Sequence, residues 1–540
     1  MVALFPWCHP SVIAYGPRSG STAEIPVLRW FAGSDDRSNL TFDVYLDTNS
    51  SPTTLVANDT SNLSYVTSNL AMGTKYYWKV VATDPSGSKT SSVMNFTVKA
   101  IPEWSYDTDD DVLSVSVSDD GEYIAAGNTN YVYLFDKDSS TPLWKHDIGV
   151  RAYAVDMSSG GEYIAAGSDA DKVYLFSKNS STPIWTYDTD DNVRAVAISA
   201  DGEYIVAGGS ANKVYLFSKD SSTPLWSYSV SNPIDSVSIS ADGEYIVAGT
   251  QSSDMKVYLF DKDSSTPLWT YTAGDTVRDV SISADGEYIV SCSGDGKVSL
   301  FHRTSSTPLW TYTVDGSFAS PSRSCELSAN GEYIAVGNME DDNRVYLFDK
   351  DSSTPLWYYS ASDNIYTVSI SKDGQYIIAG SSDDKIYFFG KDNNTPLWTY
   401  NAGGDLNSVS ISADGKYIAA GSSDDNVYTF KNSLADRPSI IPYGPRSGSE
   451  PDEPVTLRWF AGSDDISNLT FDVYNAIVVS WLDPNDTNPG TNQHTLGAYG
   501  GAYPFFTQFG GTEPTAVTVS VIGHELTGLD FSADLSYATP

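Results

Sequence analysis

Residues 120–144 read DGEYIAAGNTNYVYLFDKDSSTPLW, and this stretch returns with variations through the middle of the chain. Runs of Tyr, Val, Ile, Phe and Trp alternate with Asp-Gly and Ser-Ser turns, a pattern typical of short antiparallel strands. Four strands in a unit of about 40 to 45 residues indicate a propeller blade. The opening of the unit occurs eight times, at Asp120, Gly160, Asp201, Asp242, Asp285, Asn330, Asp373 and Asp414.

Ring closure separates a propeller from the competing interpretation, a solenoid of stacked sheets. The first fourth-strand Trp, Trp104, precedes every Asp-Gly motif, whereas the last unit ends after its third strand near Asn432. The strand around Trp104 is therefore predicted to complete the last blade, which leaves no open sheet edge. The sequence predicts an all-β chain with an eight-bladed propeller over residues 101–433. The eight fourth-strand tryptophans are Trp104, Trp144, Trp185, Trp226, Trp269, Trp310, Trp357 and Trp398.

The repeat resembles two known families. The run from Asp136 to Trp144 is similar to the tryptophan-docking repeat of quinoprotein, or PQQ-like, propellers, although Ser-Ser stands where that family has Thr-Gly. The Asp-Gly half resembles the WD40 repeat, with Phe-Asp in place of Trp-Asp. The resemblance covers about residues 102–431 and implies a fold, which by itself does not imply a function.

The segment before the propeller has an independent strand pattern. After a tail over residues 1–9, residues 10–100 contain the strand-like runs VLRWF, LTFDVYL, TKYYWKVVATD and VMNFTV. The run from Leu70 through Gly73 and Thr74 to Tyr76, followed by Trp78, resembles the fibronectin type III sandwich. The resemblance implies a second, smaller β domain with Trp30 in its core.

The opening of that module is repeated near the carboxyl end. YGPRSGS and LRWFAGSDDxSNLTFDVY occur at residues 15–45 and again at 443–474, within a region that we assign to residues 434–540. No Gly-Thr-x-Tyr half follows Tyr474; instead there are Gly- and aromatic-rich runs. One interpretation is a diverged or partial sandwich that supplies its own remaining strands. The other is a half-sandwich whose edge is filled by a strand from another subunit.

The net charge and the candidate glycosylation sequons restrict which partners and which location we expect for the protein. The 31 Lys and Arg against 69 Asp and Glu give a formal net charge of −38, which disfavours nucleic acid and anionic membranes as partners. No apolar run is long enough to span a membrane. The start, MVALFPWCHPSV, has no signal-peptide pattern, and we expect it to be a processed or incomplete end. Candidate N-glycosylation sites favour an extracellular location: Asn39, Asn49, Asn58, Asn62, Asn95, Asn179, Asn393, Asn468 and Asn485.

Candidate catalytic chemistry is sparse. Quinoprotein dehydrogenases use adjacent cysteines and a carboxylate-held calcium, whereas Cys292 and Cys325 here are 33 residues apart. No CxxCH, HExxH, GxSxG or phosphate-binding glycine loop occurs. A PQQ-dependent oxidoreductase is therefore the least favoured function, and no cofactor is expected. Cys292 and Cys325 fall on neighbouring blades and are candidates for a disulfide, with two buried free thiols as the alternative.

Two sets of acids are candidate cation ligands. At the centre of each blade's first strand the residue is small in most repeats, but Asp156 and Glu326 break this pattern in blades that face each other across the ring. A cation on the axis is one interpretation, and charges facing water in an axial channel are the favoured alternative. The turns at residues 107–111, 339–343 and 381–385 carry oxygen ligands suited to calcium but lack an EF-hand loop. Solvated turn acids are the favoured interpretation there as well.

Together these patterns predict an extracellular, non-enzymatic structural protein. Combinations of such propellers with fibronectin-like modules resemble cell-surface proteins of archaea and some bacteria. We expect the propeller to be a scaffold and the terminal modules to mediate attachment or self-assembly into a filament, sheath or surface layer, with the chain itself or other surface components as partners. The alternative is a monomeric module that binds a glycan or a protein.

Overall fold

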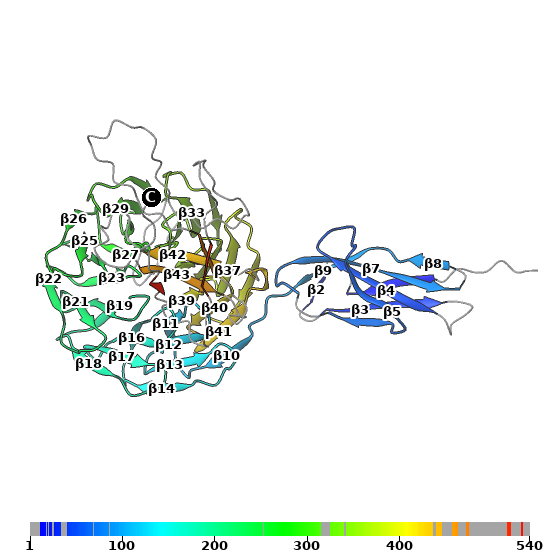
Figure 1. Cartoon of the computed structure of the whole chain (residues 1–540), viewed down its shortest axis with the longest axis horizontal. Helices are drawn as coiled ribbons and strands as arrows, with labels where there is room; N and C mark the ends of the chain where they lie inside the picture. Colours follow the sequence, from blue (N-terminus) through cyan, green and yellow to red (C-terminus); the bar gives the residue numbers. More distant parts are fainter. Residues whose placement is uncertain are drawn as a thin grey trace, which may run out of the picture. The chain divides into compact units, whose positions relative to one another are not determined.

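The computed structural model describes residues 11–435 except 18, 20, 24–25, 34–39, 68–69, 86, 252, 315–324 and 340–341. Beyond residue 435 it describes only the backbone of five strands. The main boundary between its two compact units falls between Pro102 and Glu103, and both units are built from strands (Figure 1). Within the described part of the chain, no helix has the length and apolar character needed to cross a membrane.

The first unit contains two small sheets. One joins β1 (Ser11–Gly16), β3 (Val27–Gly33) and β6 (Ser64–Val66). The other runs in the order β2 (Ser21–Ala23), β9 (Met94–Val98), β7 (Lys75–Asp84), β4 (Thr41–Asp47) and β5 (Leu55–Thr60), and β8 (Gly87–Thr90) pairs with β7.

The two sheets share one apolar core. Strand β4 alternates between buried and half-buried residues, as expected for a strand with one face on a core. Trp30 of β3 and Trp78 of β7 are among the largest fully buried side chains of the described residues. Both tryptophans belong to the same cluster, with Phe42 and Phe96 packed beside them.

The second unit contains eight four-stranded antiparallel sheets arranged around an axis (Figure 1). We call these sheets blades and number them in chain order. Blades 1 to 4 are β11 (Val112–Val117), β12 (Tyr123–Asn128), β13 (Tyr131–Asp136), β14 (Trp144–Asp147); β15 (Ala152–Met157), β16 (Tyr163–Ser168), β17 (Lys172–Ser177), β18 (Trp185–Asp188); β19 (Val193–Ile198), β20 (Tyr204–Gly209), β21 (Lys213–Ser218), β22 (Trp226–Ser229); and β23 (Ile234–Ile239), β24 (Tyr245–Thr250), β25 (Lys256–Asp261), β26 (Trp269–Thr272).

Blades 5 to 7 keep this sequential order, whereas blade 8 takes its outer strand from the start of the unit. The strands of blades 5 to 7 are β27 (Val277–Ile282), β28 (Tyr288–Ser293), β29 (Lys297–His302), β30 (Trp310–Thr313); β31 (Cys325–Leu327), β32 (Tyr333–Gly337), β33 (Arg344–Asp349), β34 (Trp357–Ser360); and β35 (Ile365–Ile370), β36 (Tyr376–Ser381), β37 (Lys385–Gly390), β38 (Trp398–Asn401). Blade 8 contains β39 (Leu406–Ile411), β40 (Tyr417–Ser422), β41 (Asn426–Lys431) and β10 (Trp104–Asp107).

Strand β10 is the outer strand of blade 8. It pairs antiparallel with β41, with Trp104 opposite Thr429 and Asp107 opposite Asn426. The all-β, propeller-like fold predicted from the repeat is thus confirmed, and the first and last segments of the propeller share one sheet. A short 3-10 turn, η2 (Ser433–Ala435), follows β41.

The Asp-Gly turn requires glycine for two reasons. Gly243 has a φ of 73°, in the left-handed region that residues with a Cβ rarely adopt. A Cβ there would also lie 2.4 Å from Cδ2 of Tyr204, a residue of the preceding blade. The same turn in each blade therefore carries both a backbone bend and a contact between blades.

Beyond residue 435 the described strands repeat part of the first unit. Strand β42 (Ser439–Gly444) pairs with β43 (Thr456–Gly462), and β43 pairs with β46 (Phe531–Ser532). Strand β44 (Phe471–Tyr474) pairs with β45 (Ala516–Val519). Strands β43 and β44 of the repeated segment thus pair with β46 and β45, and whether another subunit adds a strand to this module stays a prediction.

Candidate functional site

A closed ring of backbone hydrogen bonds surrounds the axis of the propeller. In each blade the residue just before the Asp-Gly turn, or its equivalent, donates its N–H to the C=O of the matching residue in the next blade. Asp119 donates to Ser159 over 2.8 Å, and Ala413 of blade 8 closes the ring by donating to Asp119 over 3.0 Å. The eight members are Asp119, Ser159, Ala200, Ala241, Ala284, Ala329, Lys372 and Ala413.

Three members of this ring are not alanine. Ala241, Ala284, Ala329 and Ala413 form one apolar cluster, with the half-buried Ala200 packed against it. Small side chains allow eight strands to crowd around an axis. Asp119, Ser159 and Lys372 interrupt this apolar ring with a carboxylate, a hydroxyl and an ammonium group.

The two candidate acids of the first strands, Asp156 and Glu326, accept hydrogen bonds from neighbouring blades. Asp156 of β15 accepts a hydrogen bond from the backbone N–H of Ile198 in blade 3 (3.0 Å) and one from the Ser116 hydroxyl in blade 1 (3.2 Å). Glu326 of β31 accepts from the N–H of Ile370 in blade 7 (3.0 Å). The serines at the same position act alike, since Ser410 accepts from the N–H of Val117 across the closure of the ring (3.0 Å).

Lys372 supplies a positive charge to these acids. Burial raises the pKa of Glu326, and the Lys372 charge opposes that rise. Burial likewise raises the pKa of Asp119, again against Lys372. Burial alone would lower the pKa of Lys372, but the negative charges of Asp119, Glu326 and Asp156 outweigh it and raise this pKa. The four groups therefore form one mixed-charge cluster that draws on blades 1, 2, 6 and 7.

The two candidate disulfide cysteines, Cys292 and Cys325, lie in one buried cluster between blades 5 and 6. The structure has both as free thiols, and burial raises the pKa of each. Asp279 of β27 joins this region, because its carboxylate accepts from the backbone N–H of Cys325 (3.0 Å) and from the Ser236 hydroxyl (2.8 Å). The disulfide stays a prediction, which intact mass with and without reductant would decide.

The acidic turn at residues 107–111 meets the last blade. Carboxylate oxygens of Asp110, Asp111 and Asp425 come within 4.8 Å of one another, the one such group of metal-ligating side chains among the described residues. Loss of hydration and then the charges of Asp111, Asp107 and Asp110 raise the pKa of Asp425. Such oxygens suit calcium, and the calcium prediction stays open. Residues 340 and 341 of the turn at 339–343 lie outside the described residues.

The candidate glycosylation sites can be placed only in part. Asn49, Asn58, Asn62, Asn179 and Asn393 are exposed, and Asn95 is half-buried. Asn39, Asn468 and Asn485 lie outside the described residues, as does the predicted tail over residues 1–9. Their modification stays a prediction.

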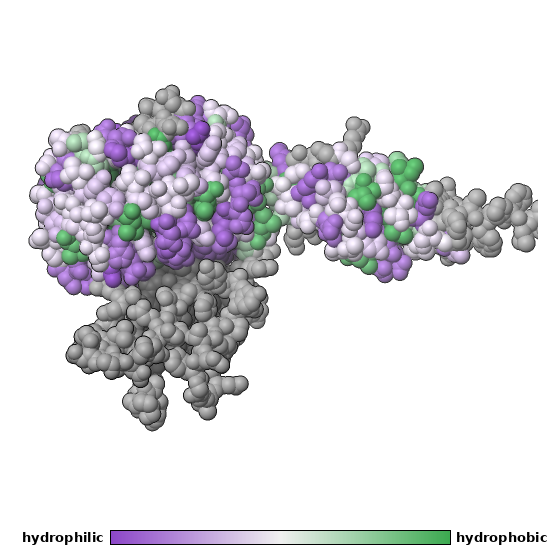
Figure 2. All heavy atoms as spheres, turned by 90° about the horizontal axis from the view of Figure 1, so that it is seen from above, coloured by the Kyte–Doolittle hydropathy of each residue, from purple (hydrophilic) through white to green (hydrophobic). Residues whose placement is uncertain are grey.

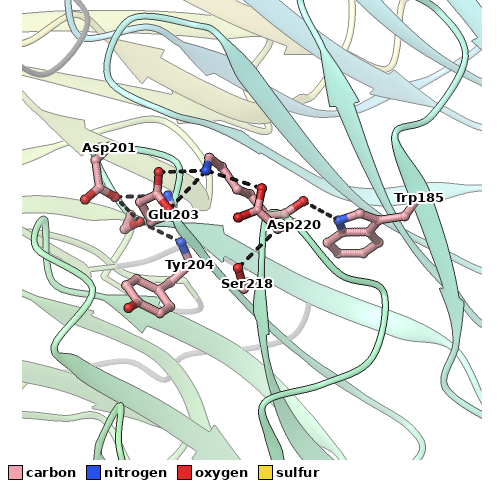
Figure 3. Close-up of polar contacts among 8 residues, drawn as sticks. Trp185, Asp201, Glu203, Tyr204, Ser218 and Asp220 are labelled. Carbon is pink, nitrogen blue, oxygen red and sulfur yellow. Dashed lines mark hydrogen bonds and ion pairs between the residues drawn. The ribbon is translucent and has the colours of Figure 1, made fainter.

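A repeated contact joins the blades at their outer strands (Figure 3). Trp185 of β18 donates its indole N–H to the backbone C=O of Lys219 in the next blade (2.8 Å), and its ring lies 5.3 Å from that of Phe217. The Lys219 ammonium then pairs with Glu203 (2.9 Å). Trp104 makes the same contact with Lys137 of blade 1 (2.7 Å), so β10 links blade 8 to blade 1.

Lys372, Asp119 and Asp279 are not among the candidate residues predicted from the sequence. Lys372 and Asp119 stand at the position before the Asp-Gly turn, where five blades have alanine, and not at the centre of the first strand. Asp279 stands two residues before the centre, where Ser236 and Ser408 occur in other blades. A charged residue in an aligned column of small residues was the signal in each case.

Comparison with known protein families identifies the same repeat that contains the tryptophan contacts. A family model described as outer membrane protein assembly factor BamB matches residues 128–283 and 253–428, which together make up more than half of the chain. The chain belongs to this family. It is a PQQ-like, BamB-type propeller repeat protein, as the docking repeat predicted. No curated protein matches the chain.

Solved structures resemble the BamB-type propeller in fold alone. The computationally designed protein Ika8 is 12% identical with a TM-score of 0.52, over 60% of this chain and 98% of that one. Sqt1 of Chaetomium thermophilum, solved bound to the N-terminus of ribosomal protein L10, is 15% identical with a TM-score of 0.54, over 61% of this chain and 98% of that one.

Proposed function

We propose that this protein is an extracellular, non-enzymatic structural protein. Its BamB-type propeller is a rigid scaffold, and its terminal modules join it to copies of itself in a filament, sheath or surface layer. The observation that carries the proposal is the duplicated strand pair, β1–β3 and β42–β43, which places the same β element before and after the propeller. A molecule with two equivalent association modules can extend in two directions, as a polymer requires.

We further propose that both terminal modules are fibronectin type III-like. In the first unit, the two-sheet order and the buried pair Trp30 and Trp78 support this assignment. The hydroxyl of Tyr76 also accepts a hydrogen bond from the backbone N–H of Ala71 (3.2 Å), which resembles the tyrosine corner of such sandwiches. In the second module, the pairing of β44 with β45 matches that of β4 with β7.

The axial groups support a scaffold role. Asp156, Glu326 and Asp279 all accept hydrogen bonds from the backbone of the next blade, and Lys372 adds a counter-charge. Side chains that hold neighbouring blades together have their polar capacity in use, which favours a structural role for them over acid–base chemistry. The exposed sequon asparagines and the net charge of −38 favour an extracellular setting without nucleic acid.

A monomeric binding module is the second candidate. Sqt1, which this chain resembles in fold, was solved bound to the N-terminus of ribosomal protein L10, and a glycan or peptide ligand for the present propeller is consistent with that fold. Light scattering that shows a stable monomer, together with saturable ligand binding, would favour this candidate. A quinoprotein-type oxidoreductase is least favoured, and stoichiometric bound PQQ, haem or metal would be needed to support it.

Truncation tests the self-assembly proposal. We expect negative-stain images of the full chain to show polymers. Deletion of residues 475–540 should abolish them, because β43 and β44 then lose their partner strands β46 and β45 and the module can no longer hold the β42–β43 pair in place. Thermal unfolding of the propeller serves as the control, because the truncated protein should retain that transition. Polymers that persist in the truncated protein would contradict assembly through the carboxyl-terminal module.

A further inference from the structure

The outer face of the sheet β1–β3–β6 is apolar and exposed. Along β3, Leu28 and Trp30 point into the core, whereas Phe31 is 61% exposed. Ile13 of β1 lies opposite Phe31 in the sheet register and is 64% exposed. Val66 of β6 is 62% exposed. A sheet face turned to water normally carries polar residues, so this face, which we call the aromatic patch, departs from the expected pattern.

The aromatic patch has a defined geometry. The rings of Tyr15 and Phe31 stack with centroids 4.2 Å apart and an interplanar angle of 17°. Ile13 flanks Phe31 across the strand pair, and Val66 lies opposite Val27 at the other side of β3. Figure 2 shows hydrophobic residues at the surface of this unit. Rigid aromatic and branched side chains lose little conformational entropy when they are covered.

The aromatic patch also differs in charge from the rest of the chain. The formal net charge of −38 means that most surfaces of two copies repel each other. The outward-facing described residues of β1, β3 and β6 include one basic residue, Arg29, and no acid. An acidic second copy of the chain can therefore approach at this face without like-charge repulsion from it.

The chain repeats this strand pair at its other end. Ile13 opposite Phe31 becomes Ile441 opposite Phe460, and the same register shift follows before the glycine. Tyr443 and Arg458 take the sequence positions of Tyr15 and Arg29. Between the two copies, the residues that differ within these strands are Val12, Ala14 and Val27, which become Ile440, Pro442 and Thr456. The three residues that the patch takes from β1 and β3, which are Ile13, Tyr15 and Phe31, are thus present twice in the sequence.

We propose that the aromatic patch is a self-association surface that pairs with a like patch on a second copy of this chain. The inference rests on the proposed self-assembly and names its contact. Because the sequence and pairing of β1 and β3 recur in β42 and β43, either strand pair can contact either strand pair on another molecule. One patch per chain would give closed dimers, whereas two patches give an open chain of molecules.

The size of the patch sets the strength of each contact. An exposed area on the order of a few hundred Å² is below the ~800 Å² per partner of a standard stable interface. A single contact is therefore weak, and assembly requires high local concentration. Added salt should strengthen it, because salt screens the repulsion between two acidic chains.

Charge substitutions on the full-length chain test the pairing. The variants are Phe31→Asp, Phe460→Asp and the double substitution, measured by sedimentation velocity over a range of concentration and salt. Leu55→Asp is the matched control, because Leu55 is exposed in the same unit but belongs to the other sheet. Phe31→Thr and Phe460→Thr repeat the test with a good strand former, in case aspartate disturbs folding.

We expect the wild type and Leu55→Asp to form species that grow with concentration. Each single variant should stop at dimers through its remaining patch, and the double variant should stay monomeric, with association weaker by about tenfold or more since each contact would bury a carboxylate. Polymers in the double variant would overturn the patch as the contact while leaving self-assembly intact. Monomeric single variants would overturn pairing of like patches. A wild type that stays monomeric at high salt would overturn both the inference and the proposed function.

Discussion

The propeller and the first unit use the same kind of strand in different ways. In the blades, the middle strand β12 is buried at five successive residues, because a neighbouring blade covers each face of its sheet. In the first unit, strand β4 alternates between buried and half-buried residues, because only one face meets the core. A closed ring of blades leaves few free sheet faces, whereas a sandwich of two sheets always has two outer faces. This difference explains why a free sheet face occurs in the first unit, whereas its apolar character comes from Ile13, Tyr15, Phe31 and Val66.

The largest loss of stability is expected at β10, the strand that closes the ring, and the outer strand β22 of blade 3 provides the reference. We expect Trp226→Ala to cost about 3 kcal/mol of propeller stability, because it removes an aromatic contact and the hydrogen bond to the Lys262 carbonyl. Trp104→Ala should cost at least as much and also release β10, because hydrogen bonds hold it to blade 8 and no short chain connection does. Hydrogen exchange should therefore accelerate selectively in β10 and β41 for Trp104→Ala. Equal exchange in the two variants would argue against a closing strand.

A glycine pair separates contact between blades from backbone strain. Gly243 and Gly149 both have positive φ, at 73° and 69°. A Cβ on Gly243 would lie 2.4 Å from Tyr204, whereas on Gly149 the nearest atom is 3.9 Å away. We expect Gly243→Ala to cost about 2–3 kcal/mol and Gly149→Ala about 1 kcal/mol in urea unfolding. Similar losses would mean that the turn does not join the blades.

The charge cluster tests how far one blade depends on others. We expect Lys372→Ala to cost about 2 kcal/mol at pH 7, because Asp119, Asp156 and Glu326 lose their counter-charge. Asp119→Ala added to Lys372→Ala should recover part of this loss, since it removes one unpaired acid and restores the residue of other blades.

The same cluster predicts a pH dependence. Asp119 and Glu326 have raised pKa values in the folded protein, so their ionisation opposes folding and this cost disappears as pH falls through the folded pKa. The loss caused by Lys372→Ala should therefore shrink as pH falls from 7 into the carboxyl range. The raised pKa of Lys372 makes its contribution complete below its unfolded pKa of 10.5, and lost only as pH rises through the higher folded value. A loss that is constant from pH 7 to the carboxyl range would contradict this account.

The smallest effect is expected at the acidic turn beside the closing strand. Asp425 has a raised pKa, so its ionisation at neutral pH opposes folding, and its φ of 71° is one that asparagine tolerates. We expect Asp425→Asn to raise the melting temperature slightly in chelator at pH 7, with Asp109→Asn, also at positive φ, as the matched control. A calcium-dependent stabilisation of the wild type that Asp425→Asn lacks would instead identify the turn as a calcium site.

The blades of the propeller could be predicted from the sequence, whereas most of the contacts around its axis could not. The repeat interval and the Asp-to-Trp spacing predict four-stranded blades, because the same residue types pack at the same positions in every blade. The ring of backbone bonds was not predictable from side chains, because any residue type can provide a peptide N–H and C=O. Lys372 was visible in the sequence only as a departure from alanine, and its partners Asp119 and Glu326 lie on other blades at separations that only the closed fold brings together.

The ring of eight peptide hydrogen bonds around the axis has one further consequence. All eight bonds point the same way around the circle, so the array has no terminal donor or acceptor and no positive or negative pole, unlike a helix. Gain or loss of one repeat by recombination would break this ring of hydrogen bonds. One N–H and one C=O would then be unpaired, unless the remaining blades changed their tilt and closed the ring again. The closed ring of hydrogen bonds therefore makes the number of repeats depend on the backbone geometry at one position in each blade.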